Sequence, residues 1–116
     1  MVSTTALNLP PDLKEALDQA VRRIVEIARP EVVILFGSYA EGTAGRDSDV
    51  DIVVVTRRKP RPDLAAELRL EVRQAGLTYP LDLLLLTRSE WEWLSDIPGH
   101  AMREAARSGV RLYEAA

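Results

Sequence analysis

Three aspartates interrupt otherwise apolar segments of this sequence, and they are its clearest candidates for chemistry. Asp49 and Asp51 stand two positions apart at the start of one segment, a spacing that points both side chains to one face of a β-strand. Asp82 is the only charge in a run of leucines over 81–86. A carboxylate beside an apolar core is costly unless it is paired, hydrogen-bonded or metal-bound. Because Mg²⁺ takes carboxylate oxygens and leaves positions for phosphate and water, the three aspartates predict a divalent-cation site.

The aspartates also have plain structural interpretations, which stay open at this point. An isolated aspartate at a strand end, such as Asp82, is more often a turn former or a helix cap than a ligand, and residues 47–49 fit an Asx turn. The acidic spacing that begins at position 47 also imitates the start of an EF-hand loop. That loop needs glycine and glutamate where this chain has Ile52 and Arg58, so the EF-hand is excluded.

A glycine-rich loop follows the apolar segment that precedes these aspartates. Gly37 and Ser38 close that segment, and Gly42 and Gly45 lie in the same loop. Glycine lets backbone N–H groups approach an anion closely, and a helix beginning after Ser38 would direct its positive end toward it. The loop has no P-loop lysine and does not match the pattern G-x-G-x-x-G. Its combination with acidic residues on two later segments predicts a phosphate site beside the cation site.

The spacing of apolar residues predicts the elements that position these side chains. Continuous apolar runs rich in β-branched residues or leucine indicate buried strands, and a one-faced spacing indicates helices. Strands are predicted over 32–36, 50–56, 81–87 and, at a sheet edge, 110–113; helices are predicted over 11–28, from 64 to about 76, around Trp91 and over about 99–108. Ser89-x-x-Glu92 matches a capping box at the start of the short helix. This order predicts an α/β domain with helices on the faces of a sheet.

Composition excludes several classes of protein. The 116 residues carry a net charge of −3, which argues against general nucleic-acid binding. The chain has no cysteine, which excludes thiolate zinc sites and disulfides, and any Ser/His triad would need its one histidine, His100. It has no apolar run long enough for a membrane span and no signal peptide. We therefore expect one cytoplasmic domain over 1–116, with chemistry based on carboxylates and no catalytic role for His100.

The spacing of the candidate residues resembles that of a known family. Gly37-Ser38, ten residues, then Asp49-x-Asp51 is the G-S-x(10)-D-x-D signature of nucleotidyltransferases in the DNA polymerase β superfamily, and the stretch resembles its minimal nucleotidyltransferase (MNT) subgroup. The resemblance implies the small nucleotidyltransferase fold, an α+β arrangement with a mixed β-sheet flanked by helices. It assigns Gly37 and Ser38 to the nucleoside triphosphate and Asp49 and Asp51 to the metal. Asp82 matches the third acidic position, which helps to hold two Mg²⁺ ions and to activate the acceptor hydroxyl.

The resemblance also implies an activity and a partner. It implies transfer of AMP from ATP to a hydroxyl acceptor, here a tyrosine of a HEPN-domain RNase toxin, with this chain as the antitoxin. Two alternatives stay open: a non-catalytic nucleotide-binding antitoxin, and a small-molecule nucleotidyltransferase similar to the aminoglycoside-modifying enzymes, with a homo-oligomer completing the acceptor pocket. Many relatives carry arginine where this chain has Glu41, so Arg46 is the candidate cation for the triphosphate. Trp91 and Trp93 fit either a partner interface or the completion of a small core.

Overall fold

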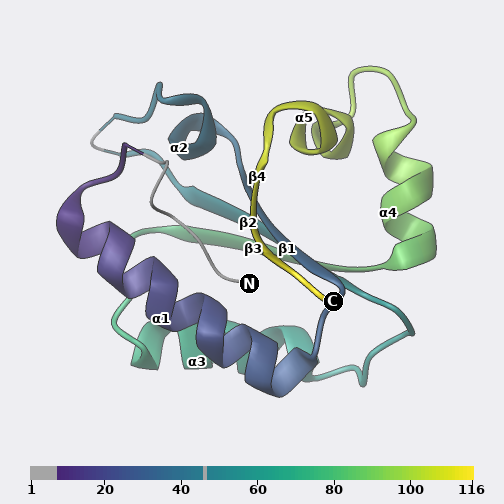
Figure 1. The fold of residues 1–116 in the computed structure, drawn as a ribbon, viewed down its shortest axis with the longest axis horizontal. Helices are drawn as coiled ribbons and strands as arrows, with labels where there is room; N and C mark the ends of the chain where they lie inside the picture. The colour runs from purple at the N-terminus through teal and green to yellow at the C-terminus, as the bar shows by residue number, and fades with distance from the viewer. Residues whose placement is uncertain (1–7, 46) are drawn as a thin grey trace.

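A four-stranded mixed β-sheet with helices on both faces forms the protein, as the computed structural model shows for residues 8–45 and 47–116 (Figure 1). This architecture confirms the predicted fold class. The elements follow one another as α1 (Pro11–Ala28), β1 (Val32–Phe36), α2 (Ser38–Glu41), β2 (Val50–Thr56), α3 (Leu64–Gln74), β3 (Leu81–Thr87), α4 (Arg88–Ser95), α5 (Ala101–Ser108) and β4 (Val110–Glu114).

The strands lie in the order β3-β2-β1-β4. β1 is antiparallel to both β2 and β4, whereas β2 and β3 are parallel and are joined by the crossover helix α3. β1 is buried along its whole length, as its apolar run predicts, because it lies inside the sheet with helices over both faces. β4 forms one edge of the sheet, where the short C-terminal strand was predicted.

The larger apolar core lies between the sheet and helices α1 and α3, which share one face of the sheet in Figure 1. α1 buries Leu13, Leu17 and Ile24 at helical spacing, and α3 buries Leu68 and Val72 in the same way. Burial of large aliphatic side chains contributes about 1.5–3 kcal/mol for each fully buried residue, so this layer provides most of the stability of the fold.

A smaller core lies on the opposite face of the sheet, under α4 and α5 (Figure 1). α5 contributes the buried side chains of Met102 and Ala105, and Trp91 and Leu94 of α4 pack against this cluster while remaining partly exposed. Trp93 lies on the outer side of α4 with 68% of its surface exposed. Trp91 therefore completes a core, whereas Trp93 does not. None of the helices described here has both the length and the apolar character needed to cross a membrane.

The start of α4 differs from the prediction, because the capping box uses Thr87 and Glu90 instead of Ser89 and Glu92. The Thr87 hydroxyl accepts a hydrogen bond from the Glu90 N–H at 3.2 Å, and the Glu90 carboxylate accepts one from the Thr87 N–H at 2.8 Å. Both residue pairs satisfy the sequence pattern, but Thr87 is extended at the end of β3 and so has the backbone conformation of a cap.

The last helix also begins later than predicted. His100 caps it by accepting a hydrogen bond at Nδ1 from the Met102 N–H, at 3.0 Å. α5 therefore starts at Ala101, and the histidine has a structural role within the fold.

Candidate functional site

The predicted site residues from three strands meet at one end of the sheet. Asp51 in β2 is the register partner of Phe36 in β1 on one side and of Asp82 in β3 on the other. Gly37 directly follows Phe36. Because neighbouring strands lie about 4.8 Å apart, Gly37, Asp51 and Asp82 form a row about 10 Å long across the sheet.

The alternation of side chains places both strand aspartates on the face of the sheet that α4 and α5 cover. Val53 and Leu84 belong to the smaller core on that face, and Asp51 and Asp82 are two positions before them on the same strands. The core-facing residues of β2 and β3 are therefore apolar except at the start of each strand, where a carboxylate takes their place. Burial decreases there, since Asp51 is half-buried and Asp82 is exposed. The site lies at the open end of this layer.

Gly37 and the Asp51 carboxylate are in close contact. A Cβ atom added to Gly37 would lie 2.2 Å from Asp51 Oδ2, a separation at which a carbon and an oxygen atom that are not bonded overlap severely. The Gly37 backbone has φ +76° and ψ −157°, a conformation that side chains other than hydrogen rarely permit. Glycine is therefore required here both for the turn and for the space that the carboxylate occupies.

Ser38 begins the short helix α2, which backbone hydrogen bonds and an aromatic contact hold in place. The Gly37 carbonyl accepts hydrogen bonds from residues 40 and 41, each at 3.1 Å, which fixes the turn after β1. Tyr39 is buried, and its ring meets Tyr79 edge-on with 6.1 Å between centroids. The Tyr79 hydroxyl donates to the Asp12 carboxylate of α1 at 3.1 Å. These contacts hold Ser38 beside the Gly37 turn.

The remaining predicted residues are less closely associated with this row. Asp49 lies one residue before β2 begins and is exposed, so the structure does not place it within the strand. Glu41 ends α2 and is also exposed, whereas Arg46 lies outside the described residues. In the part of the chain that the structure describes, no three histidine or acidic side chains converge closely enough to hold a metal ion. The structure therefore brings Asp51 and Asp82 together and leaves Asp49 at the entrance.

Comparison with known proteins identifies the family. The model of the nucleotidyltransferase domain matches residues 14–105, a span that contains Gly37, Ser38 and the three aspartates. The chain belongs to the nucleotidyltransferase domain family. No curated protein matches this nucleotidyltransferase domain in sequence.

Two solved structures resemble this nucleotidyltransferase domain. A crystal structure of a toxin-antitoxin with AMP-PNP has a TM-score of 0.58 and 23% sequence identity, over 83% of this chain and 72% of that chain. This likeness supports the fold. A Sulfolobus solfataricus protein assigned as a nucleotidyltransferase has a TM-score of 0.47 and 21% identity, over 87% of this chain and 88% of its own, and this score is too low to carry an argument.

The electrostatics of the candidate site fit a divalent cation. Burial raises the pKa of the Asp51 carboxyl, and the negative charges of Asp82 and Asp49 raise this pKa further. Within the described residues, no lysine or arginine forms an ion pair with any of the three aspartates. An all-carboxylate set of this kind suits a hard cation such as Mg²⁺, whose charge would offset the repulsion between neighbouring carboxylates.

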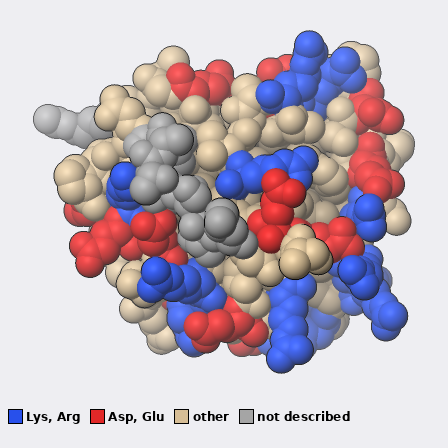
Figure 2. All heavy atoms as spheres, viewed as in Figure 1, with Lys and Arg blue, Asp and Glu red and all other residues tan. Residues whose placement is uncertain are grey.

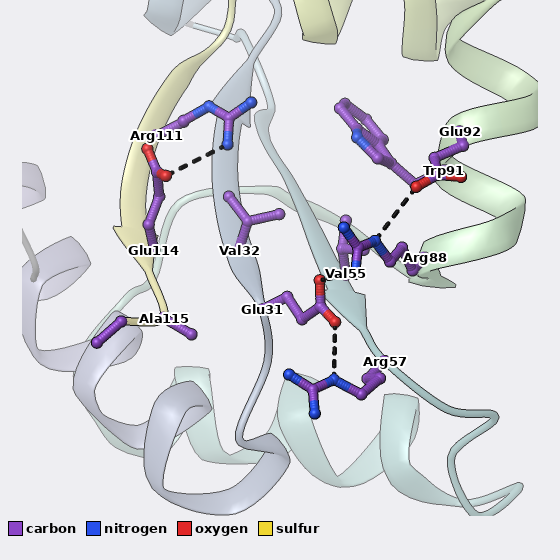
Figure 3. A pocket seen from close by; sticks show the side chains of 11 residues that line it. Glu31, Val32, Val55, Arg57, Arg88, Trp91, Glu92, Arg111, Glu114 and Ala115 are labelled. Atoms are coloured by element: carbon purple, nitrogen blue, oxygen red, sulfur yellow. Dashed lines mark hydrogen bonds and ion pairs between the residues drawn. The ribbon is translucent and has the colours of Figure 1, made fainter.

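A hollow that the sequence did not predict lies at the end of the sheet opposite to the candidate site (Figure 3). Glu31 pairs there with Arg57 at 3.1 Å and with Arg88 at 3.6 Å, and Arg111 pairs with Glu114 at 3.6 Å. These residues come from segments far apart in the sequence, so no local pattern could have revealed the cluster. Because each arginine already has a glutamate partner, the hollow has no excess of positive charge and does not point to an anion.

Proposed function

We propose that this nucleotidyltransferase domain transfers AMP from ATP, in the presence of Mg²⁺, to a hydroxyl group of a partner protein, and that the acceptor is a tyrosine of a HEPN-type RNase toxin. The chain would then act as the antitoxin. The observation that carries the proposal is the row in which the Asp51 carboxylate lies against Gly37, with Asp82 on the neighbouring strand. This row combines a turn suited to phosphate with carboxylates suited to a cation. The toxin-antitoxin structure with AMP-PNP, which shares the fold, also supports the proposal.

Each residue has a proposed role in this reaction. The backbone at Gly37 and the Ser38 hydroxyl would bind the triphosphate, and Arg46 is the proposed cation for it. Asp49, Asp51 and Asp82 would hold two Mg²⁺ ions, which supply charge neutralisation for in-line displacement at phosphorus when bound. Asp51 lies against the Gly37 turn, Asp49 directly precedes β2, and Asp82 is the exposed member of the pair that it forms with Asp51.

Asp82 is the proposed base because its strand position beside Asp51 and its exposure would leave its carboxylate accessible to an incoming acceptor. The acceptor oxygen forms a bond to the α-phosphorus while the bond from that phosphorus to the bridging oxygen breaks, and pyrophosphate leaves. The proton of the acceptor hydroxyl passes to a carboxylate oxygen of Asp82. A carboxylate base is consistent with the capping role of His100, whose Nδ1 is bound to the Met102 N–H.

Labelled ATP tests the proposal directly. The purified chain is mixed with ATP labelled in the α-phosphate, Mg²⁺ and the purified product of the neighbouring gene, and transfer is followed by gel and by mass spectrometry of the modified residue. We expect label on a tyrosine of the partner. Asp51→Asn and Asp82→Asn are expected to abolish transfer, whereas Asp47→Asn, an exposed aspartate in the same region, should leave transfer unchanged.

Other outcomes would overturn this assignment. No transfer to the partner, together with neutralisation of its toxicity by an Asp49→Ala/Asp51→Ala double variant, would identify a non-catalytic antitoxin. Transfer to an aminoglycoside in the absence of any second protein would identify a small-molecule nucleotidyltransferase.

A further inference from the structure

The outward side of α4 carries a large aromatic side chain that does not contribute to the core. Trp91 and Leu94 face the smaller core, and at 100° per residue Trp93 points almost opposite to Trp91. Trp93 is 68% exposed. Residues three and four positions away flank it on the helix surface. We call this surface, made of Ser89, Glu90, Glu92, Trp93 and Asp96, the α4 outer face.

Acidic residues surround Trp93 on this face. Glu90, Glu92 and Asp96 are all exposed. Figure 2 shows acidic side chains at the upper right-hand edge of the molecule, where Figure 1 places α4, with basic side chains directly below them. Glu92 pairs with Arg88 at 3.2 Å, and the Arg103 guanidinium donates a hydrogen bond to the backbone carbonyl of Asp96 at 3.4 Å. Among the described residues, no arginine or lysine forms an ion pair with the side chain of Glu90 or Asp96. The face therefore has negative charge that is available to a partner.

The position of the α4 outer face relates it to the candidate site. α4 covers the same face of the sheet on which Asp51 and Asp82 lie, as the shared alternation of side chains shows. Among the residues that the structure describes, the other large apolar side chain that is strongly exposed is Leu70, which is 57% exposed and lies on α3, over the opposite face. α4 follows the end of β3, whereas Asp82 lies at its start, so a protein seated on α4 would lie on the same side of the sheet as the carboxylates but toward the other end of the strands.

We propose that the α4 outer face docks a basic surface of a partner protein, with an arginine or lysine side chain of the partner stacked on the exposed Trp93 ring. Charge complementarity carries this proposal, because an indole ring framed by carboxylates favours a cation over an apolar group. The inference rests on the proposed function only for the choice of partner: an RNase must bind phosphates, and proteins that do so carry basic surfaces.

Matched substitutions test the docking surface. The probe is the purified product of the neighbouring gene, and its dissociation constant for the intact chain is measured by calorimetry. Trp93→Ala is expected to weaken binding by about tenfold or more, as for a central aromatic anchor. Leu70→Ala, which removes a similarly exposed side chain on the opposite face, should change it by less than about twofold.

Charge reversal provides the second test. Asp96→Lys is expected to weaken binding by about tenfold, and a lysine at this helix C-terminus is compatible with the helix dipole. Glu15→Lys makes the same change of charge at an exposed position of α1 and should have little effect. We also expect binding of the unmodified chain to weaken steeply with added salt.

The results separate this inference from the proposed function. AMP transfer with equal binding by the Trp93→Ala and Leu70→Ala variants would overturn the docking surface and leave the activity standing, and so would salt-independent binding. Binding that is lost in Trp93→Ala and Asp96→Lys, without any AMP transfer, would support the docking surface and remove the proposed activity. A partner that does not bind the unmodified chain would overturn both.

Discussion

Gly37→Ala tests the contact on which the candidate site is built. The substitution adds a methyl group 2.2 Å from Asp51 Oδ2 and imposes a side chain on a backbone with φ +76°. The backbone effect alone is about 1–3 kcal/mol. For a domain of this length that corresponds to a fall in Tm of roughly 4–12 °C. The steric effect adds to it, because the Asp51 carboxylate must move away.

A double-mutant cycle separates these two effects. Asp51→Ala removes the atoms nearest to the added methyl group, and the remaining Asp51 Cβ lies 3.4 Å from it, which is an ordinary contact. Gly37→Ala should therefore destabilise the Asp51→Ala variant less than the unmodified chain, with a coupling of about 0.5–3 kcal/mol. Urea unfolding of the four proteins, followed by circular dichroism, measures this coupling.

Gly42→Ala is the matched control. Gly42 has φ +80°, close to that of Gly37, but a Cβ added there would contact no atom within 4 Å. We expect a loss of about 1–2 kcal/mol from the left-handed backbone and no coupling to Asp51→Ala. If Gly37→Ala lowers the free energy of unfolding by the same amount with and without the Asp51 carboxylate, the steric explanation is refuted.

Three further predictions concern stability. The raised pKa of Asp51 means that the folded state holds this proton more tightly than the unfolded state, so the ionised carboxylate opposes folding at neutral pH and stability is gained as pH falls toward the ordinary value of 3.8. Without added metal, Asp51→Asn should therefore stabilise the fold at pH 7 by at most about 1 kcal/mol. In thermal melts the difference in stability between this variant and the unmodified chain should disappear below pH 4, and a difference that does not depend on pH would contradict this. Thr87→Ala should cost about 0.5–2 kcal/mol by removing the cap of α4, whereas Ser89→Ala should have little effect in urea titrations; equal losses would refute the observed cap. Tyr79→Phe removes the hydrogen bond to Asp12 and should cost about 0.5–1.5 kcal/mol in the same assay, and a cost that persists fully in an Asp12→Ala background would rule out this bond as its source.

Apolar patterning was sufficient to predict the elements other than the short helix α2, but not how they pair. The run over 32–36 indicates a strand buried on both faces, and β1 lies where it was predicted, inside the sheet. The pairing of β2 with β3 in parallel depends on the crossover through α3, which side-chain periodicity does not report. The choice between Thr87 and Ser89 as the cap of α4 likewise depends on where β3 ends.

The spacing of the candidate residues predicted that all three aspartates would converge, whereas the structure brings Asp51 and Asp82 together and leaves Asp49 before β2. Gly37, Asp51 and Asp82 do form one row, because Phe36 and Asp82 are both register partners of Asp51. The contact between Gly37 and the Asp51 carboxylate could not be predicted, since it depends on that register and not on spacing along the chain. The metal-binding and catalytic roles of these residues remain predictions for the assays above.

The unequal cores on the two sides of the sheet have a consequence for how the molecule opens. α1 and α3 bury several side chains completely, whereas α4 has no fully buried residue. Amide protons of α4 should therefore exchange with solvent well before those of α1 and α3, through local opening that leaves the larger core intact. The proposed docking surface is thus carried by the layer with the fewest buried side chains, so its outer residues can diversify while the folded scaffold persists.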